Sequence, residues 1–141
     1  MSACELCDSP GGEILWQDEH CRVVRVGGDE GRAFPGFCRV VWQAHVRELS
    51  DLEPGARQHL LAAVHATEVA LRQVARPDKI NLASLGNLVP HLHWHVIPRW
   101  ADDSHFPAPI WAAAARPAPA RAQPASDALR AALATALGGQ P

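Results

Sequence analysis

Apolar residues recur at two different spacings along this chain of 141 residues, and the spacing separates expected strands from expected helices. Five short segments rich in apolar and β-branched residues are expected to form strands: residues 13–17, 21–26, 37–42, 79–85 and 88–99. Asp18-Glu19-His20 separates the first two and is expected to close a hairpin. The polar, glycine-rich stretch 27–32 is expected to be a loop.

The longest helical pattern lies in the middle of the chain. Apolar residues recur there at helical spacing, which predicts one buried stripe on a helix that ends near residue 75. They are Leu60, Val64, Leu71 and Val74. Ser50 and Glu53 have the spacing of a capping box, and Pro54 suits a first helical turn, so the helix is expected to begin there.

The order of the elements, strands then a helix then strands joined by short turns, favours an α+β fold. We expect an antiparallel sheet of about five strands, one long helix, and a short C-terminal helix over residues 126–137 that Gly138-Gly139 ends. The domain is expected to cover residues 1–115, and residues 116–141 to be an Ala/Pro-rich linker with the short helix. Prolines punctuate residues 106–111, so that segment is expected to lie over a groove, on its own subunit or on a partner.

Composition narrows the classes of partner. The formal net charge of -2 gives no broad basic field, so we expect neither a nucleic acid partner nor an acidic membrane surface. No apolar run approaches the roughly 18–20 residues of a membrane-spanning helix. Residues 1–5 show no basic region followed by an apolar stretch, so the expected compartment is the cytoplasm. In that reducing compartment the four cysteines are not expected to form structural disulfides.

The main chemical signal is a row of three histidines within residues 90–99. His91, His93 and His95 occupy every second position, so on a strand they share one face. The apolar residues between them would point to the other face, into a core. Eight histidines in 141 residues give little reason to expect such a triplet by chance.

Two chemistries suit the row. A metal site is one, but positions i and i+4 of a strand are about 13 Å apart, whereas each ligand nitrogen must lie about 2.0–2.1 Å from the ion. Two neighbouring histidines can converge on an ion only with further ligands from elsewhere. Nucleophilic catalysis is the other, because an imidazole with a pKa of about 6.5 is largely neutral at pH 7 and can attack without a separate base.

The stretch from His91 to Ile97 (His, apolar, His, apolar, His, apolar, apolar) resembles the signature of the histidine triad (HIT) family. Pro98-Arg99 resembles the usual continuation, and His45-Val46 before Asp51-Leu52 and a long helix also resembles the family. The resemblance covers roughly residues 4–111 and is closest in wording to a bacterial branch related to diadenosine polyphosphate hydrolases.

The resemblance implies a mechanism. His93 would attack the α-phosphorus of a purine nucleotide and form a nucleotidyl-histidine, and His95 would hydrogen-bond the phosphate or the leaving group. Asn81, Ser84 and Asn87 would contact phosphate, with Asn87 one methylene shorter than the Gln usual at its place. The family resemblance further implies a homodimer through the long helix and the neighbouring strand, and chemistry that requires no catalytic metal.

The pair Cys4 and Cys7 has the spacing of a zinc knuckle, which alone supplies half of a tetrahedral site. The resemblance implies that His45 and His91 complete a structural Zn²⁺ site with the two cysteines. The alternative is that the cysteines are free thiols and His45 is a hydrogen-bonding residue at a strand end. Cys21 and Cys38 lie in strand patterns and are expected to be small buried apolar residues.

The resemblance therefore implies a nucleotide hydrolase or transferase acting on a dinucleoside polyphosphate or a nucleoside phosphoramidate. Two alternatives stay open: a nucleotide-binding sensor or scaffold without significant turnover, and a zinc-dependent hydrolase. Asp29 or Glu30 would either hold the ribose hydroxyls or be solvated loop charges.

Overall fold

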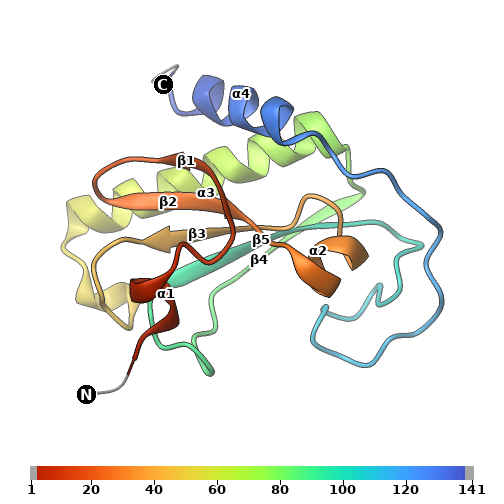
Figure 1. Cartoon of the computed structure of the whole chain (residues 1–141), viewed down its shortest axis with the longest axis horizontal. Coiled ribbons are helices and arrows are strands. Elements are labelled where there is room, and N and C mark those ends of the chain that lie inside the picture. Colours follow the sequence, from red (N-terminus) through yellow and green to blue (C-terminus); the bar gives the residue numbers. More distant parts are fainter. Residues whose placement is uncertain (1–2, 139–141) are drawn as a thin grey trace.

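The computed structural model describes residues 3–138, which form one five-stranded antiparallel sheet with helices on both faces (Figure 1). The strands are β1 (Glu13–Gln17), β2 (Cys21–Arg25), β3 (Cys38–Trp42), β4 (Lys79–Ala83) and β5 (His93–Arg99). Their order across the sheet is β1-β2-β3-β5-β4, and every neighbouring pair is antiparallel. The α+β fold expected from the sequence is confirmed, including the hairpin between β1 and β2.

The helices are α1 (Glu5–Asp8), α2 (Gly28–Ala33), α3 (Pro54–Ala75) and α4 (Ser126–Ala136), with a 3₁₀ turn η1 (Leu49–Asp51) before α3. Helices α3 and α4 pack together against one face of the sheet, whereas α1 and α2 lie in front of the sheet in Figure 1. None of the helices within residues 3–138 is long and apolar enough to cross a membrane.

Strand alternation divides the interior into a helix face and a site face. On β3, Val40 packs into the large core with Leu60 and Leu71 of α3. Its neighbour Val41 points the other way and packs with Leu6 of α1. Because β3 pairs with β5, Arg39 lies opposite His95 and Val41 opposite His93, so these four residues share the site face.

The strand that carries the histidines is shorter than the sequence predicts. It begins at His93, not at residue 88, and His91 lies before it in a turn in which its N–H donates to the carbonyl of Val89 at 2.8 Å. Backbone hydrogen bonds continue only as far as Leu92, whose carbonyl accepts the N–H of Trp42 at 3.1 Å, and Pro90 has no N–H to donate beyond that point. The prediction that all three histidines stand on one strand is therefore wrong in detail, because only two of them stand on β5.

Two further local predictions are wrong. The expected capping box at Ser50 and Glu53 is absent among the described residues: the N–H of Glu48 instead donates to Asp51 at 3.0 Å and closes η1, and α3 begins at Pro54 without a side-chain cap. The expected loop 27–32 is mostly the helix α2. It passes so close to the backbone just after β2 that a Cβ on Gly31 would clash with the carbonyl oxygen of Val26, so glycine is required there.

The C-terminal segment is tied to the domain. Arg25 of β2 donates to the carbonyl of Pro124 at 2.6 Å and to the hydroxyl of Ser126 at 3.0 Å, and Leu129 and Leu133 of α4 are buried in the main core. Helix α4 ends at Ala136, as expected to within a residue. Gly139 lies outside the described residues. The boundary at residue 115 stays a prediction.

A buried ion pair holds the loop that follows β5. Arg99 is 1% exposed, and it donates to both carboxylate oxygens of Asp103 at 2.8 and 3.1 Å. Asp103 also accepts the backbone N–H groups of Trp100, His105 and Phe106. Burial would raise the pKa of Asp103, but the Arg99 contact and the three N–H groups outweigh it and hold the pKa at about 2.

This pair predicts a loss of stability in acid. Since the pKa of Asp103 is lower in the folded chain than its ordinary value of 3.8, its contribution is fully present above about pH 4 and is lost as the pH falls towards 2. The difference in unfolding free energy between the wild type and Asp103→Asn should shrink by about 2 kcal/mol over that range, measured by urea unfolding. Asp102→Asn, at an exposed neighbour, should leave the wild-type profile unchanged. A constant difference between wild type and Asp103→Asn would contradict the assignment.

Candidate functional site

The three histidines of the motif divide into two groups. The side chain of His91 turns towards the N-terminal residues, and those of His93 and His95 face a cavity on the site face of the sheet. All three are buried. Each group has its own set of neighbours.

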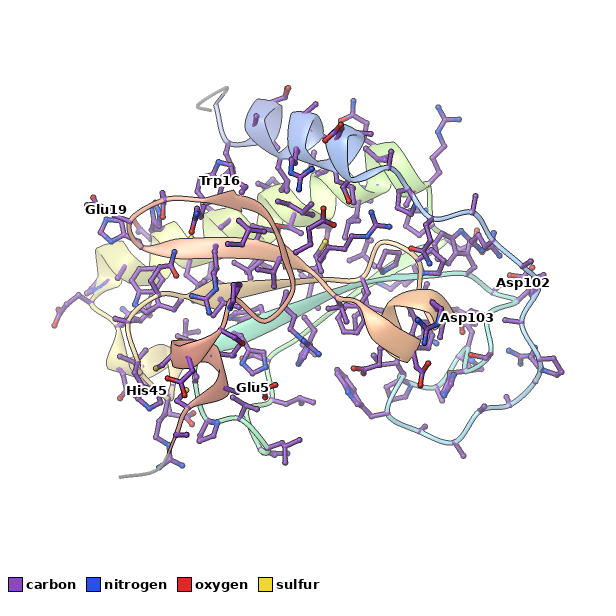
Figure 2. All side chains as sticks on the ribbon, in the orientation of Figure 1. Glu5, Trp16, Glu19, His45, Asp102 and Asp103 are labelled. Carbon is purple, nitrogen blue, oxygen red and sulfur yellow. The ribbon has the colours of Figure 1, made fainter. Side chains whose placement is uncertain are left out.

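His91 meets the two N-terminal cysteines and His45. Its Nδ1 lies 3.4 Å from the sulfur of Cys4, 3.5 Å from that of Cys7 and 3.2 Å from Nδ1 of His45. On its other side, Nε2 donates to the carbonyl oxygen of Trp42 at 2.6 Å. Since a carbonyl only accepts, the proton of neutral His91 is on Nε2 and the lone pair of Nδ1 faces the cysteines. Figure 2 shows His45 beside α1, the helix that carries Cys7.

These separations fit one tetrahedral ion. With Zn–N near 2.0–2.1 Å and Zn–S near 2.3 Å, tetrahedral geometry places two nitrogens about 3.3 Å apart and a nitrogen and a sulfur about 3.6 Å apart. The observed values are 3.2 Å between the histidine nitrogens and 3.4–3.5 Å between nitrogen and sulfur. Two thiols, two imidazoles and a carbonyl that orients one of the rings form a donor set typical of structural zinc.

A buried arginine fixes the segment that carries the cysteines. Arg22 of β2 is 7% exposed, and its guanidinium donates to the carbonyls of Leu6 at 2.6 Å, Pro10 at 2.9 Å and Ser9 at 3.2 Å. These bonds hold α1 and the following turn against the sheet. Arg22 is a site residue beyond those predicted from the sequence, and the charge inside the apolar run of β2 is the signal of such a role.

One ring nitrogen of His93 is held by the backbone and the other is free. Its Nδ1 donates to the carbonyl oxygen of His91 at 2.6 Å, which leaves the lone pair of Nε2 free. Burial lowers the pKa of His93, and the charge of Arg39 lowers it further, so the ring is neutral near pH 7. A neutral imidazole with a free Nε2 can attack an electrophile without a separate base.

His95 stands beside His93 as a neutral hydrogen-bond donor. The two ring centroids are 4.9 Å apart. Arg39 of β3 donates from Nε to Nδ1 of His95 at 3.4 Å, so the ring's own proton is on Nε2. Burial, then the neighbouring His93 and Arg39, lower the pKa of His95 to about 4. Trp111 packs edge-on to His95 with the centroids 5.1 Å apart.

Both histidines open onto a cavity of about 690 Å³. Among the expected phosphate contacts, Asn87 lines this cavity. Ser84 instead donates to the carbonyl of His93 at 2.7 Å, and Asn81 accepts a hydrogen bond from Arg99 at 2.8 Å and is not among the lining residues. Their roles towards phosphate stay predictions. Glu30 lines the cavity as well.

Two residues at the cavity carry no role in the sequence analysis. Arg39 interrupts the apolar run of β3, which is a signal for a site residue, but its position next to His95 follows only from the pairing of β3 with β5. Trp111 ends the proline-punctuated segment expected to lie over a groove, and it lies over the histidines of its own chain.

Comparison with known proteins agrees with this geometry. The family model described as the HIT domain matches residues 12–102. A curated protein of Mycobacterium tuberculosis named AP-4-A phosphorylase is 35% identical over 78 residues, which cover 51% of this chain. That match covers 40% of the relative, so the chain spans less than half of its length. An uncharacterized HIT-like protein of Saccharolobus solfataricus is 27% identical over 74 residues, 49% of this chain and 53% of its own.

Solved structures show the same fold. A histidine triad protein from Bradyrhizobium japonicum superposes with a TM-score of 0.71 at 25% identity, over 95% of this chain and 96% of its own. A histidine triad protein from Marinobacter aquaeolei superposes with a TM-score of 0.70 at 26% identity, over 96% and 95%. The likeness therefore includes α4, which lies beyond the residues that the family model matches.

Proposed function

The chain belongs to the HIT family, and from this we propose that it is a nucleotide hydrolase or transferase that attacks the α-phosphorus of a purine nucleotide through His93. One observation carries the proposal: Nδ1 of His93 is held by the His91 carbonyl, so that Nε2 is free within the cavity. The curated AP-4-A phosphorylase supports a dinucleoside polyphosphate as one substrate class, and a nucleoside phosphoramidate is the other.

The proposed reaction has two displacements. Nε2 of His93 forms a bond to the α-phosphorus, and the bond from phosphorus to the leaving atom breaks with its electron pair on that atom: a phosphate oxygen departs as an anion, and an amine nitrogen takes up a proton from solvent as it departs. The Nδ1–H of His93 stays bonded to the His91 carbonyl, which stabilises the positive ring. Water then attacks phosphorus, the P–N bond breaks with its electrons on Nε2, and a proton passes to solvent. The product is a nucleoside monophosphate.

His95 and Asn87 are proposed to bind phosphate oxygens during both steps. The Nε2–H of His95 donates a hydrogen bond next to the reacting nitrogen, and Asn87, which lines the same cavity, adds an amide donor. Neither residue has to gain or lose a proton for this role.

We also propose that Cys4, Cys7, His45 and His91 hold a structural Zn²⁺, which supplies cross-linking of the N-terminal segment to the sheet and no chemistry. His91 then joins the two groups of residues: its ring is a ligand, and its carbonyl orients His93.

The homodimer implied by the resemblance is likewise a proposal. Strand β4 lies at an edge of the sheet, and Leu82 on it is 44% exposed.

The proposal predicts turnover with a covalent intermediate. Incubation with diadenosine tetraphosphate or adenosine phosphoramidate should release AMP, and rapid acid-free quenching followed by mass spectrometry should find an adenylyl group on His93. Tight AMP binding without release of product from either compound would favour the sensor or scaffold instead. Labelling at a residue other than His93 would contradict the assignment of the nucleophile.

A further inference from the structure

We propose that Arg39 forms, next to His95, a subsite for a phosphate group bonded to the α-phosphorus, so that the site selects a phosphate chain over an amine as the leaving group. This inference rests on the proposed function and names the substrate class of the same site. It depends on four observations: the charge of the cavity, the contacts of Arg39, its place relative to the nucleophile, and the protonation of His95.

Arg39 supplies the positive charge of the cavity. Among the described residues that line it, no other arginine and no lysine is present, whereas Glu5 and Glu30 contribute carboxylates. A phosphate chain carries several negative charges, and a guanidinium binds two phosphate oxygens at once through its fork of N–H groups. A cavity built for an uncharged leaving group has no need of a half-buried arginine, whose charge is costly to remove from water.

Arg39 is only partly satisfied by the protein. Its Nε donates to His95 at 3.4 Å, and its Nη2 lies 3.6 Å from a carboxylate oxygen of Glu30. The Glu30 side chain is 49% exposed, so this ion pair is weak and a ligand phosphate can replace it. A guanidinium has five N–H donors, and two contacts leave donors available to a ligand.

The position of Arg39 suits a leaving group. His93 and His95 stand on β5 with their ring centroids 4.9 Å apart, and Arg39 lies opposite His95 on the neighbouring strand β3, where its Nε contacts Nδ1 of His95. An in-line displacement by His93 puts the leaving atom on the side of phosphorus away from Nε2. The next phosphate of the chain then extends from His95 towards Arg39.

The protonation of His95 agrees with this selection. Burial, and then His93 and Arg39, lower the pKa of His95 to about 4, so it is neutral at pH 7 and a poor donor of a proton to a departing amine. A phosphate departs as an anion and needs no proton, only a fixed positive charge. Arg39 supplies that positive charge to the departing phosphate.

The test compares two substrates in each variant. For Arg39→Met, the ratio of kcat/KM for diadenosine tetraphosphate to kcat/KM for adenosine phosphoramidate should fall about 10- to 100-fold, the loss of one charge-assisted contact to phosphate. Arg39→Lys keeps the charge without the fork and should lose less. Arg32→Met is the matched control, because Arg32 is exposed on α2 and pairs with Asp29 outside this cavity. An unchanged ratio in Arg39→Met would overturn the proposal.

Two arms separate this inference from the proposed function. If the wild type turns over neither compound, the proposed function fails, and inorganic triphosphate still tests the subsite: calorimetry should detect binding to wild type and Arg32→Met but not to Arg39→Met. Equal binding to all three would refute the subsite.

With added inorganic phosphate, an incoming phosphate oxygen would attack the adenylyl-histidine, break its P–N bond and form ADP. A smaller share of ADP in Arg39→Met supports the same subsite for incoming phosphate, and an equal share limits it to the leaving chain.

Discussion

Replacing His93 with alanine is expected to reduce nucleotide turnover by at least about 10⁴-fold, because the variant has no atom that can bond to phosphorus in the first displacement. The remaining donors can still bind a nucleotide, since Asn87, His95 and Arg39 line the cavity independently of His93. We therefore expect the loss in kcat, with a much smaller change in the affinity for AMP. Steady-state kinetics and calorimetric titration with AMP measure the two quantities.

His65→Ala is the matched control, since His65 is exposed on α3, on the helix face of the sheet. It should keep wild-type turnover and should carry the adenylyl group on His93 after quenching. A His93→Ala protein that retains a tenth or more of wild-type turnover would rule out nucleophilic attack by this residue. Circular dichroism of both variants shows whether each is folded.

The strands and the long helix could be predicted from the sequence because their signals are local. The apolar run of β3 and the spacing of Leu60 and Leu71 each depend on neighbours within one element. The helix α2 could not be predicted, since glycine has low helix propensity, and only the close approach of the Val26 carbonyl explains why Gly31 is required there. The start of β5 was placed too early because the apolar residues before Pro90 resemble a strand.

The site residues that belong to a sequence motif could be predicted. The residues that strand pairing brings to the site could not. The sequence contains the alternating histidines, but the hydrogen bond of His93 to the His91 carbonyl follows from the turn before β5. The place of Arg39 beside His95 requires the register of β3 against β5, which no local pattern determines. Asn81 is expected to contact phosphate from its place in the motif, but its side chain accepts a hydrogen bond from Arg99 on the neighbouring strand. A motif comparison gives no information about such a contact between strands.

Removing zinc is expected to lower the melting temperature by about 10–15 °C, the second large effect. An ion present at about a thousand times its dissociation constant stabilises the folded chain by about 4 kcal/mol, because it binds the assembled four-residue site and not the unfolded chain. Wild-type protein should contain one Zn²⁺ per chain by elemental analysis, and a chelator should lower its melting temperature in differential scanning calorimetry. Cys7→Ala should contain none and should show no chelator effect.

The difference between two cysteine variants separates the metal from packing. Cys7 is exposed and Cys38 is fully buried, with burial raising the pKa of the Cys38 thiol to about 12. Cys38→Ala should therefore melt lower than wild type in all buffers yet keep the full chelator effect, whereas Cys7→Ala should match the chelated wild type. Below the melting temperature, chelation should slow turnover by no more than about 100-fold, through the His91 carbonyl that orients His93. Complete loss of turnover in folded, chelated protein would instead make the metal catalytic and restore the zinc-dependent hydrolase.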